Sequence, residues 1–434
     1  MKRLAIVYLS PEALRANPRN ARSHSDKQIE QIMASIRSFD FNVPVVVDAG
    51  GTILAGHGRV EAAKRLGIEV IPTVAIDHLD EAQRRAFMLA DNRLNELSDW
   101  NEDILAIELE ELALADSAFE ITDTGFALEI VDRLVEERYQ QESEDELDDP
   151  PIARGTVPCV ARAGDLWLMG KHRLFVGDAL DRASYQVLLG SAKAQMAFTD
   201  PPYNVKIRGH VSGQKGAREF AMGSGEMSAS EFGRFLDRSC EMLTEHSQDG
   251  SIHYICMDWR GLQTLLEAGG SVYAELKNIC CWVKRQGGMG SLYRSQHEMI
   301  AVFKSGKAPH VNNVQLGKHG RNRTNVWQIA GMNTFQKGRD EKLSWHPTVK
   351  PVELIAEAML DCSARGGLVL DPFAGSGSTA IAAERTGRVA ALIELDPLYA
   401  DVILHRFAKV TGVAPVNAAT GATIGPPELK EKAA

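Results

Sequence analysis

The order of hydrophobic and polar positions divides the chain into two parts with different patterns. In the first part, the β-branched run 45–47 predicts a strand, and residues 59–66 favour a helix that Gly67 stops. Residues 70–77 predict a further strand. From residue 79 to about 112, apolar residues recur at three- and four-residue spacing, which is typical of helix. The first part is therefore expected to be a small α+β domain.

The second part alternates strand-like and helix-like segments. Residues 194–203 predict a buried strand that ends in a polar loop, and residues 366–387 predict a strand, a glycine-rich loop and a helix. A further strand is expected at 389–397. This alternation indicates an α/β fold with a doubly wound mixed sheet, in which ligands bind beyond the carboxyl ends of the strands.

An acidic stretch at 136–155, closed by Pro150-Pro151, separates the two parts and is typical of an extended linker. We therefore expect one domain at 1–135 and another at 156–412. Residues 413–434 are rich in small side chains, which predicts a flexible tail.

The charge is distributed unevenly between the two domains. The net charge of the chain is −10, but residues 1–150 contribute 15 − 31 = −16 and residues 151–434 contribute 33 − 27 = +6. Within 277–342 the balance is 12 − 3 = +9. A solvated charged face would explain a basic segment by itself, but its place between the polar loop of 194–203 and the glycine-rich loop of 366–387, where ligands are expected to bind, favours a polyanion site.

The remaining composition describes an ordinary globular protein. The chain is 44% hydrophobic and 24% charged, and no apolar run approaches the 18 residues of a membrane span. Its six cysteines are scattered without CxxC pairs, so we expect free thiols and no metal site. These features predict a protein of the reducing cytoplasm.

The glycine-rich turn in DPFAGSGST (371–379) is a candidate cofactor site. Gly375 and Gly377 permit a tight turn and close backbone approach, and the helix that follows offers free N–H groups. Glu394 ends the next strand, where an acidic side chain commonly holds ribose hydroxyls. A purely structural turn explains the glycines alone; Glu394 favours a nucleoside cofactor.

DPPY (200–203) is a candidate catalytic motif. Asp200 offers a carboxylate, the rigid Pro201-Pro202 loop offers a fixed carbonyl, and Tyr203 offers a flat aromatic ring. Two acceptors and a stacking surface suit an exocyclic amine on a planar base. A proline-stiffened turn after a strand is the structural alternative.

Taken together, these motifs resemble the β-class of DNA amino-methyltransferases, in which the catalytic motif precedes the cofactor motif. GDAL (177–180), DPPY, HPTVKP (346–351), DPFAGSGST and IELDP (393–397) follow one another in the order of that family. The resemblance covers about 164–410 and implies a target-recognition region at about 204–345. The hairpin-like segment 282–306 is also similar to the family.

The resemblance implies S-adenosylmethionine as cofactor and a set of site residues. Catalysis would involve Asp200, Pro201, Pro202 and Tyr203, with Tyr203 stacking on a base flipped out of double-stranded DNA. The cofactor would be bound by Asp178, Thr348, Lys350, Asp371, Pro372, Phe373, Gly375, Ser376, Gly377, Ser378, Glu394 and Asp396. Thr348 and Lys350, near a helix start, would hold the methionine carboxylate. Candidate DNA contacts in the basic segment are Lys284, Arg285, Arg294, Arg321 and Arg323.

The N-terminal domain resembles the ParB/sulfiredoxin-like superfamily through residues 53–67 and 89–96. Members hold nucleotide phosphates with a glycine- and arginine-containing turn, which Gly56, His57, Gly58 and Arg59 would form here. No cysteine precedes Cys159, so reductase chemistry is excluded. Nucleotide binding and a purely structural or docking role both remain open for this turn.

The expected function is transfer of a methyl group to N6 of adenine, because DPPY is commoner than SPPY in that subgroup. N4-cytosine methylation, methylation of RNA or protein amines, and a non-catalytic ParB-like adaptor are the alternatives. Pro158-Cys159 matches the dipeptide of C5-cytosine enzymes but lies outside the motif order. The expected partners are DNA and a nucleotide at the N-terminal turn; a homodimer is compatible with the sequence, and no membrane contact is expected.

Overall fold

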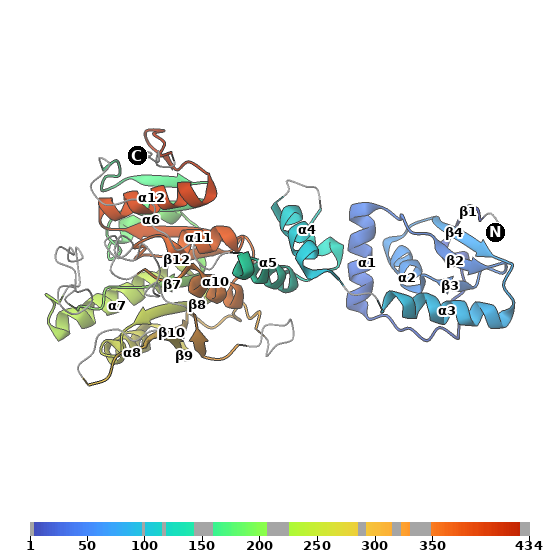
Figure 1. Cartoon of the computed structure of the whole chain (residues 1–434), viewed down its shortest axis with the longest axis horizontal. Helices are drawn as coiled ribbons and strands as arrows, with labels where there is room; N and C mark the ends of the chain where they lie inside the picture. The colour runs from blue at the N-terminus through green and yellow to red at the C-terminus, as the bar shows by residue number, and fades with distance from the viewer. Residues whose placement is uncertain are drawn as a thin grey trace, which may run out of the picture. The chain divides into compact units, whose positions relative to one another are not determined.

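The computed structural model describes residues 4–97, 100–114, 119–142, 159–205, 225–284, 292–314, 323–329 and 349–425. The chain forms two units, Met1–Tyr139 and Gln140–Ala434 (Figure 1). Their boundary falls inside the segment expected to be a linker. The first residues of that segment are nevertheless helical, because helix α5 runs from Leu128 to Glu142.

The first unit contains a four-stranded sheet with the order β1-β4-β2-β3. The strands are β1 (Ile6–Leu9), β2 (Val45–Asp48), β3 (Ile53–Ala55) and β4 (Ile71–Ile76). Only β2 and β4 are parallel. Val45 and Val47 are buried on the side of α2 (His57–Leu66), which ends as expected at Gly67 in the left-handed conformation.

The helical pattern at 79–112 forms two helices rather than one. Helix α3 (Glu81–Asn95) begins with a capping box between Asp80 and Gln83, and α4 (Glu102–Leu114) begins after Asn101. The Asn101 side chain accepts a hydrogen bond from the Ile104 N–H, which starts a new helix where the periodicity alone shows no break. The remaining helices of this unit are η1 (Pro11–Ala13), α1 (Asp26–Phe39) and η2 (Ile121–Thr124).

The second unit is built on a ten-stranded mixed sheet with the order β11-β9-β10-β8-β7-β12-β13-β6-β5-β14. Strands β8, β7, β12, β13 and β6 are parallel, and β10 is antiparallel to both β8 and β9. The strands are β5 (Leu166–Met169), β6 (His172–Val176), β7 (Ala194–Thr199), β8 (Ser247–Met257), β9 (Glu275–Val283), β10 (His297–Lys304), β11 (Val326–Gln328), β12 (Leu368–Asp371), β13 (Val389–Glu394) and β14 (Val416–Asn417).

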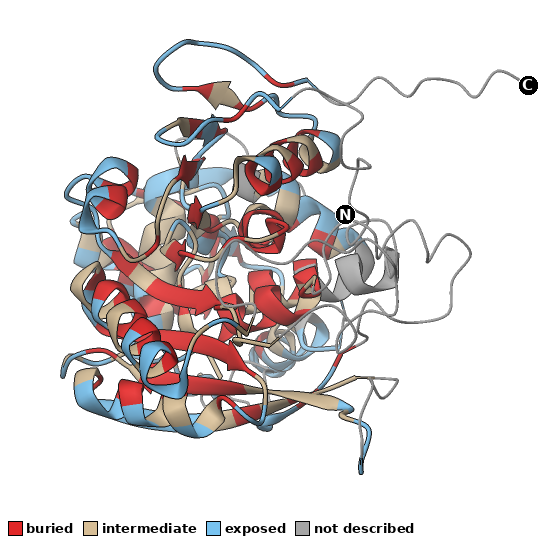
Figure 2. Cartoon of the chain, turned by 90° about the vertical axis from the view of Figure 1, so that its left-hand side faces the viewer, coloured by how far each residue is buried: buried red, intermediate tan, exposed pale blue. Residues whose placement is uncertain are grey.

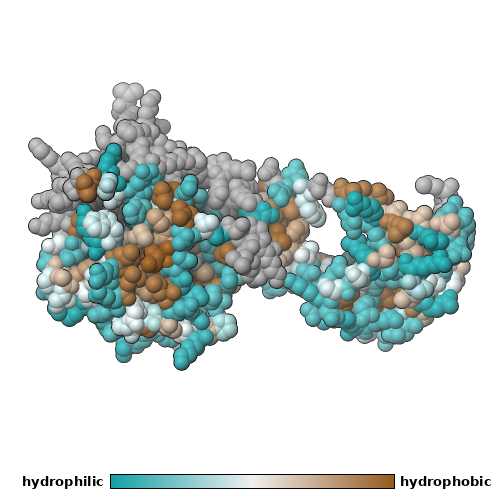
Figure 3. Space-filling view, turned by 90° about the horizontal axis from the view of Figure 1, so that it is seen from below, coloured by the Kyte–Doolittle hydropathy of each residue, from teal (hydrophilic) through white to brown (hydrophobic). Residues whose placement is uncertain are grey.

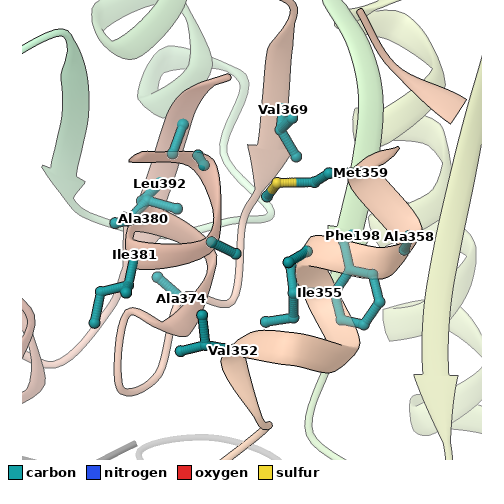
Figure 4. Packing of buried hydrophobic residues seen from close by; sticks show 14 of the residues in the cluster. Phe198, Val352, Ile355, Ala358, Met359, Val369, Ala374, Ala380, Ile381 and Leu392 are labelled. Carbon is teal, nitrogen blue, oxygen red and sulfur yellow. The ribbon is translucent and has the colours of Figure 1, made fainter. Parts of the chain in front are cut away.

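Helices cover both faces of this sheet, and each face has its own buried cluster. Helices α10 (Val352–Cys362), α11 (Ser378–Arg385) and α12 (Pro397–Thr411) pack on one face. Figure 4 shows Ile355 of α10 beside Phe198 of β7 in this cluster, to which Val352 and Ile381 also belong. Helices α6 (Arg182–Leu189), α7 (Ala229–Glu245) and α8 (Leu262–Val272) pack on the other face. The central strands are buried between the two layers (Figure 2). The doubly wound mixed sheet is therefore confirmed.

The beginning of the expected flexible tail is folded. Strand β14 pairs with β5, Val416 forms a bridge with Thr423, and Ile424 is buried in the core of the second unit. The tail prediction was wrong for residues 413–425. Composition alone does not show that Ile424 enters the core, or that β14 pairs with the edge strand β5.

On the face shown in Figure 3, the described surface of each unit is mainly hydrophilic, with local hydrophobic areas. Among the residues that the structure describes, no helix is long and apolar enough to cross a membrane.

Candidate active site at the carboxyl edge of the sheet

The glycine-rich turn connects the end of β12 to the start of α11. Gly375 and Gly377 both have positive φ, +55° and +81°, as a turn between strand and helix requires. A Cβ on Gly377 would lie 2.8 Å from the Ile403 side chain of α12. The packing of α12 therefore requires glycine at position 377, whether or not a ligand also approaches the backbone there.

Asp371, expected to line the cofactor pocket, joins three elements of the fold. Its buried carboxylate accepts hydrogen bonds from Thr199 Oγ1 (2.9 Å) at the end of β7 and Thr379 Oγ1 (2.6 Å) in α11. The N–H of Phe373 is a third donor at 3.2 Å. Burial raises the pKa of Asp371 to about 6, although these hydrogen bonds oppose the rise. Asp371 therefore holds the turn in place through contacts within the protein.

Arg406 of α12 is a buried residue of this turn that the sequence interpretation missed. Its Nη1 donates to the backbone oxygen of Ser376 (3.1 Å) and to the hydroxyls of Ser376 (3.2 Å) and Ser378 (3.0 Å). Both serines were expected to contact the cofactor, but their hydroxyls bind Arg406. The signal that could have indicated this role is the spacing of Arg406, which lies three and four residues after the apolar Ile403 and Val402 and therefore on the same helix face.

Glu394 lies where the turn and the next strand meet. Its side chain is 8% exposed; one oxygen accepts the N–H of Gly375 (2.9 Å) and the other accepts the N–H of Asp396 (3.0 Å). Burial raises the pKa of Glu394 to about 7 against these two hydrogen bonds. Each carboxylate oxygen keeps a lone pair for a further donor, so the residue fits a pair of ribose hydroxyls.

Asp178 follows β6, the strand next to β13. The N–H of Gly177 donates to the backbone oxygen of Glu394 (2.9 Å), and the Asp178 carboxylate accepts the N–H of Leu180 (2.8 Å). Three further residues expected at the cofactor site have contacts within the protein. Pro372 is buried, and Phe373 packs against Phe235 with 5.7 Å between the ring centroids. Asp396 caps α12. The structure thus brings Asp178, Glu394 and the glycine-rich turn to one edge, as expected.

The DPPY motif follows β7 at the same edge. Tyr203 Oη donates to Asp200 Oδ1 at 2.5 Å and lies 3.2 Å from Glu298 Oε2 at the start of β10. The Asp200 side chain is 20% exposed, so it remains reachable from solvent. Thr199 links the motif to Asp371 and hence to the cofactor turn.

Lys350, which was expected to bind the methionine carboxylate, contacts the DPPY motif in the structure. Its Nζ lies 2.6 Å from Asp200 Oδ2, 3.0 Å from Glu298 Oε2 and 3.2 Å from Tyr203 Oη. The side chain is 6% exposed. Two closely spaced, largely buried carboxylates need a cation, and this requirement decides the position of Lys350. Thr348, its expected companion, lies outside the described residues.

Glu298 was not identified from the sequence, although it completes the cluster. Burial by itself would raise the pKa of Glu298, but Lys350 and Lys284 outweigh it and lower that pKa to about 2. For Lys350 the effect of burial is likewise outweighed by Asp200 and Glu298, which raise its pKa. Burial raises the pKa of Asp200, Lys350 opposes this rise, and Glu298 adds to it.

Two of the expected DNA contacts have partners inside the protein. Arg323 pairs with Glu357 and with Asp361 (3.4 Å) of α10 and lies over the Trp327 ring. Lys284 pairs with Glu298. The sequence interpretation did not include these intramolecular partners, because local charge composition does not show carboxylates supplied by distant elements. Arg294 is exposed, and Arg285 and Arg321 lie outside the described residues.

The candidate nucleotide turn of the first unit begins α2. Gly56 has φ +100° and precedes the helix, and the His57 ring accepts the N–H of Asn17 at 3.3 Å. A Cβ on Gly58 would lie 3.2 Å from the His24 ring. Burial lowers the pKa of Arg59, and the nearby Asp91 partly offsets this.

Cys159 does not have the properties of a nucleophile. Burial and the nearby Asp401 raise the pKa of its thiol to about 12. This pKa disfavours the alternative of C5-cytosine chemistry.

The fold places the glycine-rich turn, Glu394 and the DPPY motif together at the carboxyl edge of the parallel strands. Residues 194–405 match the family model described as DNA methylase, and residues 2–93 match the ParB N-terminal domain. Residues 194–405 belong to the N6/N4 DNA methylase family, and the N-terminal domain is ParB-like. The protein is a DNA methyltransferase, and S-adenosylmethionine is its cofactor.

Individual relatives are similar to each half. The chain is 38% identical to the ParB-like nuclease domain-containing protein YnaK of Escherichia coli over 84 residues, 19% of this chain and 97% of the relative. It is 22% identical to the type II methyltransferase M2.MboI of Moraxella bovis over 253 residues, 55% of this chain and 89% of the relative. Among solved structures, the cytosine-N4-specific PvuII DNA methyltransferase matches with a TM-score of 0.41 and 17% identity, over 54% of this chain and 85% of that one.

Proposed function

We propose that this enzyme methylates N6 of adenine at a specific sequence in double-stranded DNA. The observation that carries the proposal is the Asp200 carboxylate, held by Lys350 and Tyr203 beside the rigid Pro201-Pro202 backbone. A carboxylate and a carbonyl next to each other accept the two N–H bonds of one exocyclic amine. The sequence DPPY, rather than SPPY, favours adenine over cytosine N4.

Glu394, Gly375 and Asp178 would hold the nucleoside part of S-adenosylmethionine. Glu394 offers two acceptor oxygens to the ribose, and its own hydrogen bonds to Gly375 and Asp396 fix their direction. Gly377 and Asp371 support this binding indirectly by shaping the turn. When bound, the cofactor would supply an electrophilic methyl group from its sulfonium, and its sulfur would leave as a neutral thioether.

Asp200 and Pro201 would act on the target amine. The amine is a weak nucleophile because its lone pair is delocalised into the base. Hydrogen bonds to the two acceptors favour a tetrahedral nitrogen with a localised lone pair, and they fix its direction of attack. As the nitrogen forms its new bond it becomes cationic and then loses a proton, which Asp200 is placed to accept.

The base must leave the duplex to reach this site. Lys350 Nζ lies 5.4 Å from the Tyr203 ring centroid, so we propose that the opposite ring face stacks on the flipped base. Arg294, on the segment between β9 and β10, is the described cation that we retain as a DNA contact, and Arg285 and Arg321 remain proposals.

For the first unit, we propose nucleotide binding at Gly56–Arg59, with a structural or docking role as the alternative.

Nucleoside mass spectrometry of DNA methylated by the purified full-length protein tests the proposal. Wild-type enzyme should produce N6-methyladenine, and the Asp200→Asn variant should produce none. N4-methylcytosine as the product would overturn the adenine assignment and keep the amine mechanism. Modification of RNA or protein instead of DNA, or no modification at all, would reject the substrate.

A further inference from the structure

Glu298 is a described carboxylate that shares the environment of Asp200 but lies in the hairpin-like segment 282–306, outside the catalytic and cofactor motifs. Strand β10 is antiparallel to β8, so its first residues lie at the carboxyl edge of β7 and β8. The Glu298 side chain is 13% exposed. Its Oε2 contacts Lys350 Nζ (3.0 Å) and Tyr203 Oη (3.2 Å), and its Oε1 binds Lys284.

This arrangement changes the charge that the target amine would meet. A lysine 2.6 Å from Asp200 would by itself neutralise the carboxylate. Transfer of a methyl group to a neutral amine places positive charge on the nitrogen, so a neutral pair would stabilise the transition state poorly. With Glu298 ionised on the other side of Lys350, Asp200, Lys350 and Glu298 together carry one net negative charge. Lys284 pairs with Oε1, the oxygen of Glu298 that does not contact Lys350, and its side chain is 24% exposed, so solvent screens its positive charge more than that of the buried Lys350.

We propose that Glu298 is a positioning residue for methyl transfer, which holds Lys350 between two carboxylates and so leaves Asp200 with negative charge toward the amine. This inference rests on the proposed role of Asp200. Glu298 acts through Lys350 and Tyr203, and it need not touch the DNA or the cofactor. It places a determinant of rate on β10, in a chain segment separate from DPPY and the glycine-rich turn.

The isosteric variant Glu298→Gln removes the charge while retaining the shape of the side chain. We expect kcat to fall by roughly 10- to 100-fold, less than the loss typical of a group in direct contact with the reacting atoms. KM for DNA and the affinity for S-adenosylmethionine should stay within about threefold of wild type, since an interaction made in the transition state alone lowers kcat.

The pH profile of kcat gives a readout that a structural role alone would not move. The negative charge of Glu298 helps to raise the pKa of Asp200, so its removal should shift the acid limb of the profile to lower pH. The described titratable or charged groups that face Asp200 are Tyr203 after β7, Cys256 of β8, Lys284 after β9, Glu298 of β10, Lys350 before α10 and Asp371 of β12. The variant changes one of them.

Glu384→Gln is the matched control. Glu384 also binds a lysine (Lys171, 3.1 Å) and a ring group (His172, 2.7 Å), and its pKa is likewise lowered to about 2. Its partner His172 begins β6, at the opposite edge of the sheet from DPPY. Single-turnover methylation by this variant should match wild type.

Glu298→Asp retains the charge on a shorter side chain and should recover part of the rate lost in Glu298→Gln. A wild-type rate in Glu298→Gln would overturn the inference. So would a slower rate with an unmoved acid limb and no recovery in Glu298→Asp. Both results leave the proposed function intact if wild type methylates DNA and Asp200→Asn does not.

Discussion

Replacing Glu394 by glutamine should weaken S-adenosylmethionine binding by a predictable amount and remove its dependence on pH. In the structure both carboxylate oxygens already bind backbone N–H groups, at 2.9 and 3.0 Å. The amide group of glutamine would present a donor to one of these N–H groups and lose the charge. Hydrogen bonds to a charged group contribute about 1.5 to 3 kcal/mol, so we expect Kd to rise roughly 10- to 150-fold.

The pH dependence follows from the raised pKa of Glu394. Its pKa is about 7 in the free protein, so the carboxylate gains a proton as the pH falls through 7 and can then offer fewer acceptors. Ribose hydroxyls favour the ionised form, so binding should release a proton below pH 7. Wild-type affinity should therefore be about tenfold weaker at pH 6 than at pH 8, whereas the affinity of Glu394→Gln should vary little.

Isothermal titration calorimetry of the full-length protein at pH 6, 7 and 8 measures both effects. Buffers with different ionisation enthalpies report the released proton directly. Glu384→Gln serves again as the control and should bind like wild type. Undiminished affinity in a folded Glu394→Gln variant, or a wild-type affinity that does not change between pH 6 and 8, would refute the role of this carboxylate.

Two further predictions concern the supporting structure. Gly377→Ala should lower the free energy of unfolding by roughly 1 to 3 kcal/mol more than Gly412→Ala. Both glycines have positive φ, but of the two positions only 377 has an atom close enough to clash with a Cβ. Equal melting temperatures of the two variants would contradict this prediction. Arg323→Met should lower the free energy of unfolding by about 3 kcal/mol, because it leaves Glu357 and Asp361 without their guanidinium partner. The same variant should leave the salt dependence of DNA binding unchanged. A reduced salt slope with normal stability would restore Arg323 as a phosphate contact.

The parts of the site that could be predicted are those encoded over short distances in the chain. The turn at Gly375 and Gly377, the carboxylate at Glu394 and the loop at DPPY each follow a buried strand, so the rule for carboxyl ends of strands places them together. The beginning of α2 at the Gly56 turn could be predicted for the same reason.

The missed features depend on pairings between distant segments. Glu298 reaches Tyr203, 95 residues away, through the order of strands β7, β8 and β10, which the local pattern does not determine. Lys350 was assigned from its place before a helix, but two buried carboxylates decide its contacts. Arg323 was counted as part of a basic segment, whereas acidic residues of α10 neutralise it. In each case the role of the residue depends on a partner that is distant in the sequence, and the local pattern does not identify that partner.

The central claim is that the amine of a DNA base is methylated at Asp200. Modification-sensitive sequencing of genomic DNA from cells expressing wild-type protein or Asp200→Asn tests it most directly, with calorimetric binding of S-adenosylmethionine measured for both proteins. The account predicts N6-methyladenine at one sequence motif with wild type, none with the variant, and similar cofactor affinity for the two. Equal methylation by both proteins, or unmodified DNA from cells containing folded, cofactor-binding wild-type protein, would contradict it.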